Sequence, residues 1–419
     1  MLPADDRDTL AHSSKPTSVL SPKRPVDDKA GLADLFPYYA GFSYKWAKQR
    51  FDEFDLPANA LVLDPWNGSG TSLVAAQATG IASVGVDLNP VACAVARLKV
   101  EGLGASIPVV KPPQSVPTLA DHEPLLAWFS PRAAERLRSW ADARPQPQGS
   151  LSTIVVKVSL FRVARCLTKR FEGSNPTWVR ISRGCDECVD VAPAVIDELM
   201  IEAQVGITSR LLEYHGATTP SSVVMASSKH LPLASASVDA ILTSPPYLTR
   251  IDYGVAYSRE LAVLGIQVGR DRSMHSRALR EQLMGTTLIR RSAMRELSVA
   301  ATANDLLKRV ADHPSKASGG YYLKQIRQYL QDLTQSLDEL TRVAKSGALM
   351  TLVVQDSYYK DVPIPLAAIC VEEAQARGWL LVGEPAERDV KRHLTQLNTA
   401  ARAYIKGKVA ESEITLRSP

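Results

Sequence analysis

The chain has 419 residues, of which 45% are hydrophobic and 22% charged, and its formal net charge is +5. This is the composition of a globular protein with a large core, and the length allows two or three domains or one domain with long insertions. So mild a positive charge does not by itself indicate nucleic-acid binding, and no apolar run approaches the length of a membrane span, so we expect a soluble, cytoplasmic protein.

The N-terminal residues 1–30 combine early acids and several prolines with no apolar run. This pattern fits neither a signal peptide nor a transit peptide, and it predicts a flexible tail. An alternation of apolar strands and helices follows. We predict a strand over residues 60–64, a glycine turn that opens a helix, and a second strand over 82–87. The next helix is predicted to begin at Pro90, with Asn89 as its cap.

Two further segments continue the alternation. One holds a strand over residues 221–226 and a buried strand over 238–243. The other begins near residue 321 with an amphipathic helix that should stop at Gly347. It continues with a strand, a helix, a strand and a last strand, at residues 348–356, 362–378, 379–384 and 411–418. This alternation predicts an α/β fold whose mostly parallel sheet is covered by helices on both faces.

Two long insertions, residues 100–220 and 250–320, interrupt this pattern and are expected to be mainly helical. The sheet-containing catalytic domain would then consist of residues 31–99, 221–249 and 321–419. Both insertions carry a surplus of positive charge, with seven Lys or Arg against one Glu in the first basic stretch and twelve against seven acids in the second. A charge run is usually a solvated face. The two surpluses lie in insertions around one candidate site, which favours a groove for a polyanion.

The turn after the first strand has features of a nucleotide-binding loop. The strand ends at Asp64, and Gly68 and Gly70 allow the backbone to turn tightly beside a ligand. Asp87 closes the next strand, where a carboxylate can accept hydrogen bonds from ribose hydroxyls. The full G-x-G-x-x-G pattern is absent, because residues 71–73 are Thr-Ser-Leu. We therefore favour a nucleoside without phosphates over a dinucleotide.

The sequence TSPPY at residues 243–247 follows a buried strand. Its two prolines fix their own φ angles and push the residue before them out of helical space. The product is a stiff, extended elbow with the Ser244 hydroxyl at its start and the Tyr247 ring at its end. The elbow is either a rigid turn at the exit of the strand or a clamp for a flat, polar ring.

Three motifs together resemble the S-adenosylmethionine-dependent DNA amino-methyltransferases, which methylate N4 of cytosine or N6 of adenine. The motifs are DPWNGSGT at residues 64–71, GVDLN at 85–89 and TSPPY at 243–247. The segment FPYYAGF at 36–42 also resembles the aromatic segment that precedes the first motif in that family. The resemblance covers the sheet segments, and it implies a Rossmann-like methyltransferase fold with a seven-stranded sheet.

The resemblance implies roles for individual residues. The S-adenosylmethionine site would be formed by Phe36, Tyr39, Asp64, Trp66, Gly68, Gly70, Thr71, Asp87, Leu88, Ser227 and Thr243. The target base would be held, and the methyl transfer carried, by Ser244, Pro245, Pro246 and Tyr247. The polyanion would then be DNA, and the two basic insertions would be the regions that bind and recognise it. From their charge and their position after the elbow, contacts to DNA are expected from Lys169, Arg170, Arg250, Tyr253, Arg290 and Arg291.

The chemistry of an exocyclic amine supports the clamp interpretation of the elbow. The lone pair of the amine is delocalised into the base ring, so acceptors on its two N–H groups are needed to make the nitrogen nucleophilic. The Ser244 hydroxyl and the Pro245 carbonyl can accept these bonds in a preset geometry, and Tyr247 can stack on the base. The base must leave the duplex to reach them.

The five cysteines bear on three questions. Their odd number in a long chain is typical of a reducing compartment. Methylation at carbon 5 of cytosine needs a cysteine nucleophile, typically after a proline, and none of the five follows a proline, which excludes that chemistry. Cys185-x-x-Cys188 is half of a zinc pattern without a second pair, so we predict two ordinary thiols and no metal site. The nearby Trp178 is expected to be buried.

Serine at the head of the motif is more frequent, in the resembled family, among N4-cytosine enzymes, which favours cytosine N4 over adenine N6. Near the cofactor adenine, Ser227 stands where the family often has an acid. Two other functions stay open: an RNA or tRNA base methyltransferase, and a non-catalytic DNA-binding subunit that kept the fold. The two insertions lie inside the chain rather than at one end, which favours DNA over RNA as the substrate. The intact glycine turn and elbow favour an enzyme over a non-catalytic subunit. A separate restriction nuclease or another defence component is a candidate partner.

Overall fold

The computed structural model describes residues 20–23, 32–39, 41–143, 150–173, 178–214, 219–248, 251–266, 274–290, 296–316, 318–390 and 409–419. Arg250, Arg291 and all but residues 20–23 of the predicted tail lie outside them. The strands are β1 (Leu61–Asp64), β2 (Ala82–Asp87), β3 (Ser221–Met225), β4 (Val238–Thr243), β5 (Ala344–Gln355), β6 (Ser357–Tyr359), β7 (Val362–Ile364), β8 (Leu380–Leu381), β9 (Ala386–Asp389) and β10 (Ala410–Arg417).

Helices account for most of the remaining described residues. The α-helices are α1 (Tyr44–Glu53), α2 (Thr71–Ala78), α3 (Pro90–Glu101), α4 (Pro131–Asp142), α5 (Leu151–Leu167), α6 (Pro193–Leu212), α7 (Tyr253–Ala256), α8 (Ser258–Val263), α9 (Met274–Gln282), α10 (Ala301–Ala311), α11 (Leu323–Val343) and α12 (Leu366–Gln375). Short helical turns are η2 (Pro124–Ala127), η3 (Lys169–Phe171), η4 (Cys185–Glu187) and η5 (Ser318–Tyr322).

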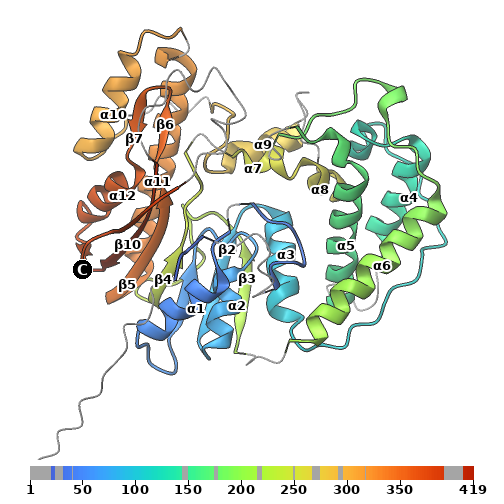
Figure 1. The fold of residues 1–419 in the computed structure, drawn as a ribbon, viewed down its shortest axis with the longest axis horizontal. Coiled ribbons are helices and arrows are strands. Elements are labelled where there is room, and N and C mark those ends of the chain that lie inside the picture. The colour runs from blue at the N-terminus through green and yellow to red at the C-terminus, as the bar shows by residue number, and fades with distance from the viewer. Residues whose placement is uncertain are drawn as a thin grey trace, which may run out of the picture.

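The central sheet has the strand order β3-β2-β1-β4-β5-β10-β8, with β9 also paired to β10 (Figure 1). The strands from β3 to β5 run parallel, and β10 is antiparallel to β5. The chain builds the sheet outward in opposite directions from β1 and β4, so a topological switch point lies between these two strands, where α/β proteins bind their ligands. Their parallel register brings Asp64 and Thr243 to the same edge.

The sheet has eight strands rather than the predicted seven. The difference lies at its last position, where β8 and β9 pair with opposite ends of β10. They are separated by a bend at Gly383, which has a positive φ of 69°. One edge position is therefore occupied by two short strands.

Helices cover both faces of the sheet, as the sequence predicts. Successive strand residues point to opposite faces, so Val62 and Ala240 pack with α1 and α2, whereas Leu63 and Ile241 pack with α10, α11 and α12. The helix α3 contacts β2 and β3 and turns its other side to α5. Asn89 caps α3 as expected, with its side-chain oxygen accepting from the Val91 amide at 3.0 Å.

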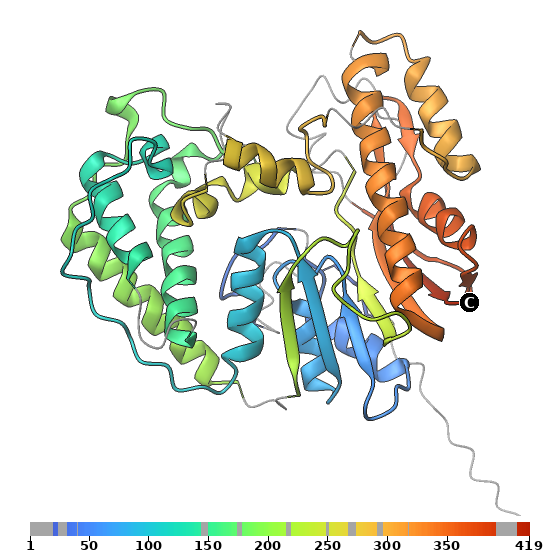
Figure 2. The same cartoon turned by 180° about the vertical axis from the view of Figure 1, so that it is seen from behind.

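The two insertions are mainly helical and contact each other. The helices α4, α5 and α6 from the first insertion share one hydrophobic core with α3 and with α8 from the second (Figure 2). Within it, Trp140, Phe161 and Leu261 are fully buried. The helices α7, α8 and α9 extend from this core across the carboxyl ends of the strands, above the sheet in Figure 1. No helix among the described residues is long and apolar enough to span a bilayer.

Two element boundaries differ from the sequence predictions. The helix α11 ends at Val343 rather than at Gly347, because β5 already begins at Ala344 and pairs with Val238. Gly347, with a positive φ of 80°, lies where the register between β4 and β5 shifts. The helix α12 begins only at Leu366, because residues 362–364 pair with β6 as strand β7.

Candidate active site

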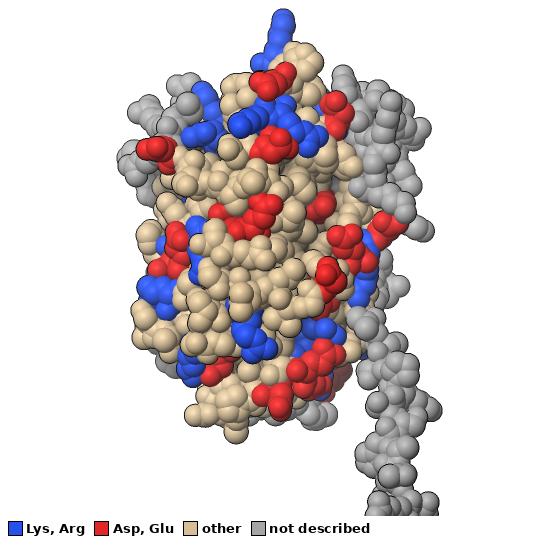
Figure 3. All heavy atoms as spheres, turned by 90° about the vertical axis from the view of Figure 1, so that its left-hand side faces the viewer, with Lys and Arg blue, Asp and Glu red and all other residues tan. Residues whose placement is uncertain are grey.

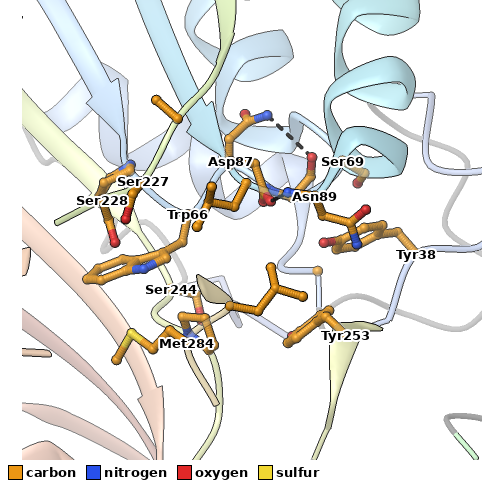
Figure 4. Close-up of a pocket in the computed structure, with 18 of the residues that line it drawn as sticks. Tyr38, Trp66, Ser69, Asp87, Asn89, Ser227, Ser228, Ser244, Tyr253 and Met284 are labelled. Carbon is orange, nitrogen blue, oxygen red and sulfur yellow. Dashed lines mark hydrogen bonds between the residues drawn. The ribbon is translucent and has the colours of Figure 1, made fainter. Parts of the chain in front are cut away.

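A pocket of about 850 Å³ that opens to solvent lies at the carboxyl ends of β1, β2 and β3. Its walls are the loop after β1, the end of β2, the loop after β3 and the elbow after β4, and Tyr253 and residues 282–284 lie over it. Figure 4 shows Tyr38 and Tyr253 at one end, Trp66 with Ser227 and Ser228 at the other, and Ser244 between them. The pocket is thus elongated, with aromatic side chains at both ends.

The carboxylate of Asp87 lies at the middle of this pocket. Its Oδ2 accepts from the Gly68 amide at 2.9 Å and its Oδ1 from the Asn89 amide at 2.7 Å, which fixes the group between the glycine turn and the start of α3. Burial raises the pKa of Asp87 from 3.8 to about 6, and the backbone hydrogen bonds oppose this rise. Each carboxylate oxygen retains a lone pair for a ligand hydroxyl.

The two glycines of the turn are required for different structural reasons. At Gly68, with a φ of 52°, a Cβ would lie 2.8 Å from the Tyr38 ring, so only glycine lets this ring pack on the loop. At Gly70, with a φ of 77°, a Cβ would lie 2.9 Å from the Cβ of Ala96 on α3. Gly68 lines the pocket, whereas Gly70 allows the close approach of two helices behind it.

Asp64 and Thr243 lie behind the pocket wall rather than in it. Asp64 is 2% exposed and accepts from the Thr243 hydroxyl at 2.6 Å and from the hydroxyl of Ser72. Burial raises the pKa of Asp64 to about 6, against these hydrogen bonds. The carboxylate joins the end of β1 to the end of β4, so it positions the glycine turn relative to the elbow and does not face the predicted cofactor.

The elbow is held by hydrogen bonds from two neighbouring elements. The Ser244 hydroxyl donates to the Val353 carbonyl of β5 at 2.8 Å, and the Tyr329 hydroxyl of α11 donates to the Pro246 carbonyl at 2.7 Å. Because the Ser244 proton is used in this bond, its oxygen lone pairs remain available to accept. Ser244 can therefore act as a hydrogen-bond acceptor, which is the role predicted for it in binding the base amine.

A second pocket, of about 710 Å³, adjoins the first at Ser244. Gly41, Phe42 and Ser244 line both pockets, whereas Tyr247 lines only the second. Its remaining lining residues are Pro22, Lys23, Val353, Gln355, Val390 and Glu411. The elbow therefore lies between two cavities, and Ser244 lines both of them.

The structure brings together most of the residues that the sequence predicts for the cofactor site. Trp66, Gly68, Thr71, Asp87, Leu88 and Ser227 line the first pocket, together with Ser244, Pro246 and Tyr253. In the aromatic segment, Tyr38 and Phe42 line the first pocket, and Tyr39 does not. Phe36 is fully buried against Phe161 and Tyr257 instead. Pro245 is buried.

Several lining residues were missed at the sequence level. Leu283 and Met284 cover the first pocket, and Gln355 and Glu411 line the second. No local motif marks these four residues, since they reach the site only through the docking of α9 and the pairing of β5 with β10. Asn89, predicted only as a helix cap, also lines the first pocket.

Part of the positive charge of the insertions is neutralised inside the protein. Arg165 pairs with Glu260 at 2.6 Å and Arg259 with Glu172 at 2.7 Å, both largely buried. Arg290, a predicted DNA contact, is 14% exposed and pairs with Asp332 of α11 at 2.7 Å. Only the third pair lowers the surplus counted along the sequence, because Glu260 and Glu172 are already subtracted in that count, whereas Asp332 lies outside the insertions.

Other basic residues of the first insertion do reach the surface. Lys169 and Arg170 are exposed on η3. Trp178, expected to be buried, is 55% exposed, and the nearby Ile181 is 46% exposed. Trp178 belongs to the connection between α5 and α6 rather than to a packed helix, which is why no core covers it. Cys185 is exposed, and no group of three metal-binding side chains occurs among the described residues.

A mostly parallel sheet with its pocket at the switch point, a glycine turn after β1 and an elbow after β4 that reaches this pocket define a Rossmann-like methyltransferase fold. The chain is 22% identical over 399 residues to Type II methyltransferase M.BsoBI of Geobacillus stearothermophilus, covering 82% of this chain and 77% of that protein. It is 23% identical over 392 residues to Type II methyltransferase M.AvaI of a Nostoc species, covering 82% and 78%. The chain is thus related, at low identity, to Type II methyltransferases.

No protein-family model matches the chain. Among solved structures, a geranyl diphosphate methyltransferase in complex with SAM covers 94% of this chain at 10% identity and a TM-score of 0.33. The rRNA methyltransferase aviRa from Streptomyces viridochromogenes covers 91% at 12% identity and a TM-score of 0.30. Superpositions with TM-scores this low add nothing to the strand order given above.

Proposed function

We propose that the protein is a DNA methyltransferase that uses S-adenosylmethionine to methylate an exocyclic base amine, N4 of cytosine in preference to N6 of adenine. The observation that carries this proposal is the position of Ser244, which lines both the pocket around Asp87 and a second pocket that contains Tyr247. Methyl transfer needs two ligands that meet at one point, and the two cavities share this residue. The similarity to Type II methyltransferases supports the same function.

The first pocket fits S-adenosylmethionine along its length. Asp87 would accept hydrogen bonds from the ribose hydroxyls at the middle of the pocket. The adenine would lie at the end with Trp66 and Ser227, and the methionine part would lie along the glycine turn toward Tyr38. When bound, the cofactor supplies an electrophilic methyl group on a positively charged sulfur.

The second pocket would hold a base that has left the duplex. Tyr247 provides a stacking surface, and a base stacked on an aromatic ring is stabilised by about 1–3 kcal/mol. Ser244 and the Pro245 carbonyl would accept hydrogen bonds from the amine. The bonds to Val353 and Tyr329 hold the elbow in place before the base arrives, so little reorganisation is needed during the reaction.

The DNA would lie on the edge formed by α7, α8, α9 and the connection between α5 and α6, which share the upper side of Figure 1. That connection exposes Lys169 and Arg170 together with Trp178, a combination of phosphate-binding and stacking side chains. The face in Figure 3, by contrast, mixes basic and acidic side chains without a surplus of either. We therefore expect DNA to bind at the former edge rather than at this face.

Nucleoside mass spectrometry tests the proposal directly. DNA from an unmodified host, incubated with the protein and S-adenosylmethionine, should yield N4-methylcytosine. Tyr247→Ala should hold the flipped base poorly while cofactor affinity stays nearly normal, and Ser244→Ala should slow turnover without abolishing cofactor binding. Ser237→Ala, at the other end of β4, is the matched control and should behave as the parent.

Products other than N4-methylcytosine would contradict different parts of the proposal. N6-methyladenine would overturn the base preference and leave the clamp standing. Finding 5-methylcytosine, or full activity in Tyr247→Ala, would contradict the mechanism. Methylation of RNA without methylation of DNA would favour an RNA base methyltransferase, and cofactor binding without any methylation would favour a binding subunit. A restriction nuclease is the partner we propose, on the similarity to Type II methyltransferases.

A further inference from the structure

One cross-strand pair contributes two polar residues to the second pocket, which Lys23 also lines. Gln355 at the end of β5 lies directly opposite Glu411 of β10, so both side chains project from the same face of the sheet. Gln355 also follows by two residues Val353, whose carbonyl accepts from the Ser244 hydroxyl. Gln355 therefore stands on the strand next to the elbow and Glu411 on the strand beyond it, and both residues line the pocket that contains Tyr247.

Gln355 carries an unused hydrogen-bond donor. The side chain is 7% exposed, and its buried Nε2 has no hydrogen-bond partner among the residues that the structure describes. A buried amide without a partner is unfavourable unless a ligand satisfies it. Rotation about the last side-chain bond, which is soft, exchanges the positions of the amide nitrogen and oxygen, so the two N–H donors can turn toward a molecule in the pocket.

The edges of the two candidate bases differ where such a donor would act. Both cytosine and adenine have a ring nitrogen acceptor next to the carbon that bears the amine. Beyond it, cytosine has a carbonyl oxygen, whereas adenine has a C–H group. An amide N–H placed at this position can donate to the carbonyl oxygen of cytosine, whereas in adenine it would face a C–H group that accepts no hydrogen bond. Thymine has the same carbonyl oxygen, but it carries an N–H at the ring nitrogen and no exocyclic amine to donate to the elbow.

We infer that Gln355 reads the Watson–Crick edge of the target base and selects cytosine, with Glu411 beside it in the wall of the pocket. This inference rests on the proposed function, because it takes the second pocket as the base site. It gives a physical reason for the base preference that is independent of the serine in TSPPY. A site that satisfies a base through a buried donor also rejects bases that leave the donor unpaired.

Two variants and one control test it. Gln355→Met keeps the length of the side chain and removes the donors, and Gln355→Glu keeps the shape and replaces donors by acceptors. Ser412→Ala is the control. Ser412 lies on β10, and its buried hydroxyl also has no hydrogen-bond partner among the described residues, but it lines neither pocket. We would measure methyl transfer to unmodified genomic DNA, cofactor affinity by calorimetry, and the thermal unfolding midpoint of each protein.

Both Gln355 variants should lose about ten- to a hundredfold in kcat/KM, as expected for an unpaired buried hydrogen-bonding group, with cofactor affinity within twofold of the parent. Ser412→Ala should keep the parent's activity. Full activity in Gln355→Met, or a loss of cofactor binding in both variants, would overturn the inference. A parent that makes N6-methyladenine would overturn it while leaving amine methylation standing, and a parent that methylates no DNA would overturn both.

Discussion

Asp87 links the protonation of one side chain to cofactor binding. Burial raises its pKa to about 6, well above the ordinary 3.8. The group is ionised at pH 8 and mostly protonated at pH 5, and only the carboxylate can accept from both ribose hydroxyls. A ligand that binds the ionised form loses affinity as the pH falls through the pKa of the free protein.

We therefore expect the dissociation constant of S-adenosylmethionine to be constant above about pH 7 and to rise about tenfold per pH unit below about pH 6. Calorimetry between pH 5 and 8 measures this. Asp87→Asn should bind weakly at all pH values and show a flatter profile. An affinity in the parent that is the same at pH 5 and pH 8 would exclude Asp87 as the ribose acceptor.

The hydrogen-bonding role of Ser244 depends on a residue outside the TSPPY motif. A hydroxyl can donate or accept, and the motif alone does not say which. The Ser244 hydroxyl donates its hydrogen bond to the Val353 carbonyl, so its lone pairs remain free to accept. The neighbouring strand β5 therefore determines that Ser244 acts as an acceptor.

The strands β1 and β4 are joined at the site by a buried carboxylate. Asp64 accepts from Thr243 across the switch point at 2.6 Å, and both side chains are almost inaccessible. This bond sets the distance between the glycine turn and the elbow, and therefore between the two pockets.

Thr243→Val should lower the free energy of unfolding by about 1–3 kcal/mol, because a buried carboxylate loses one of its donors. It should also reduce turnover more than cofactor affinity, since the elbow shifts relative to the first pocket. Chemical denaturation and steady-state kinetics measure the two effects. Thr351→Val, which removes a hydroxyl pair between β5 and β10 instead, should leave turnover nearly unchanged. Unchanged turnover in Thr243→Val would show that the tie does not position the elbow.

The basic residues of the insertions fall into two groups, those held in buried ion pairs and those exposed to solvent. Arg290 is held by Asp332, so reversing its charge would break an ion pair that is largely shielded from solvent and would not report on DNA alone. Lys169 and Arg170 are exposed on the edge that we assign to DNA.

Reversing both charges, Lys169→Glu with Arg170→Glu, should weaken DNA binding and reduce the slope of log K against log salt by about 2, at about 0.9 per phosphate contact. Fluorescence anisotropy over a salt series measures this slope. Arg417→Glu, on an exposed residue at the end of β10 opposite to the carboxyl ends of the parallel strands, is the control and should keep the parent slope. A parent slope in the Lys169→Glu, Arg170→Glu variant as well would place the DNA elsewhere.

The sequence by itself determined the features that depend on neighbouring residues. The strand over residues 238–243 and the capped start of α3 were predicted at their observed positions, because apolar runs and capping residues act over a few residues. The glycine turn with Asp87 was recognisable for the same reason. Each of these features is specified by a continuous stretch of chain.

Only the tertiary structure decided which side chains meet. The segment FPYYAGF was predicted to line the cofactor site, but packing against Phe161 and Tyr257 turns Phe36 inward and leaves Tyr38 facing the pocket. Gln355 and Glu411 become neighbours through the antiparallel pairing of two distant strands. Such contacts follow from the packing of whole elements against each other, and this information is not present in any short stretch of the sequence.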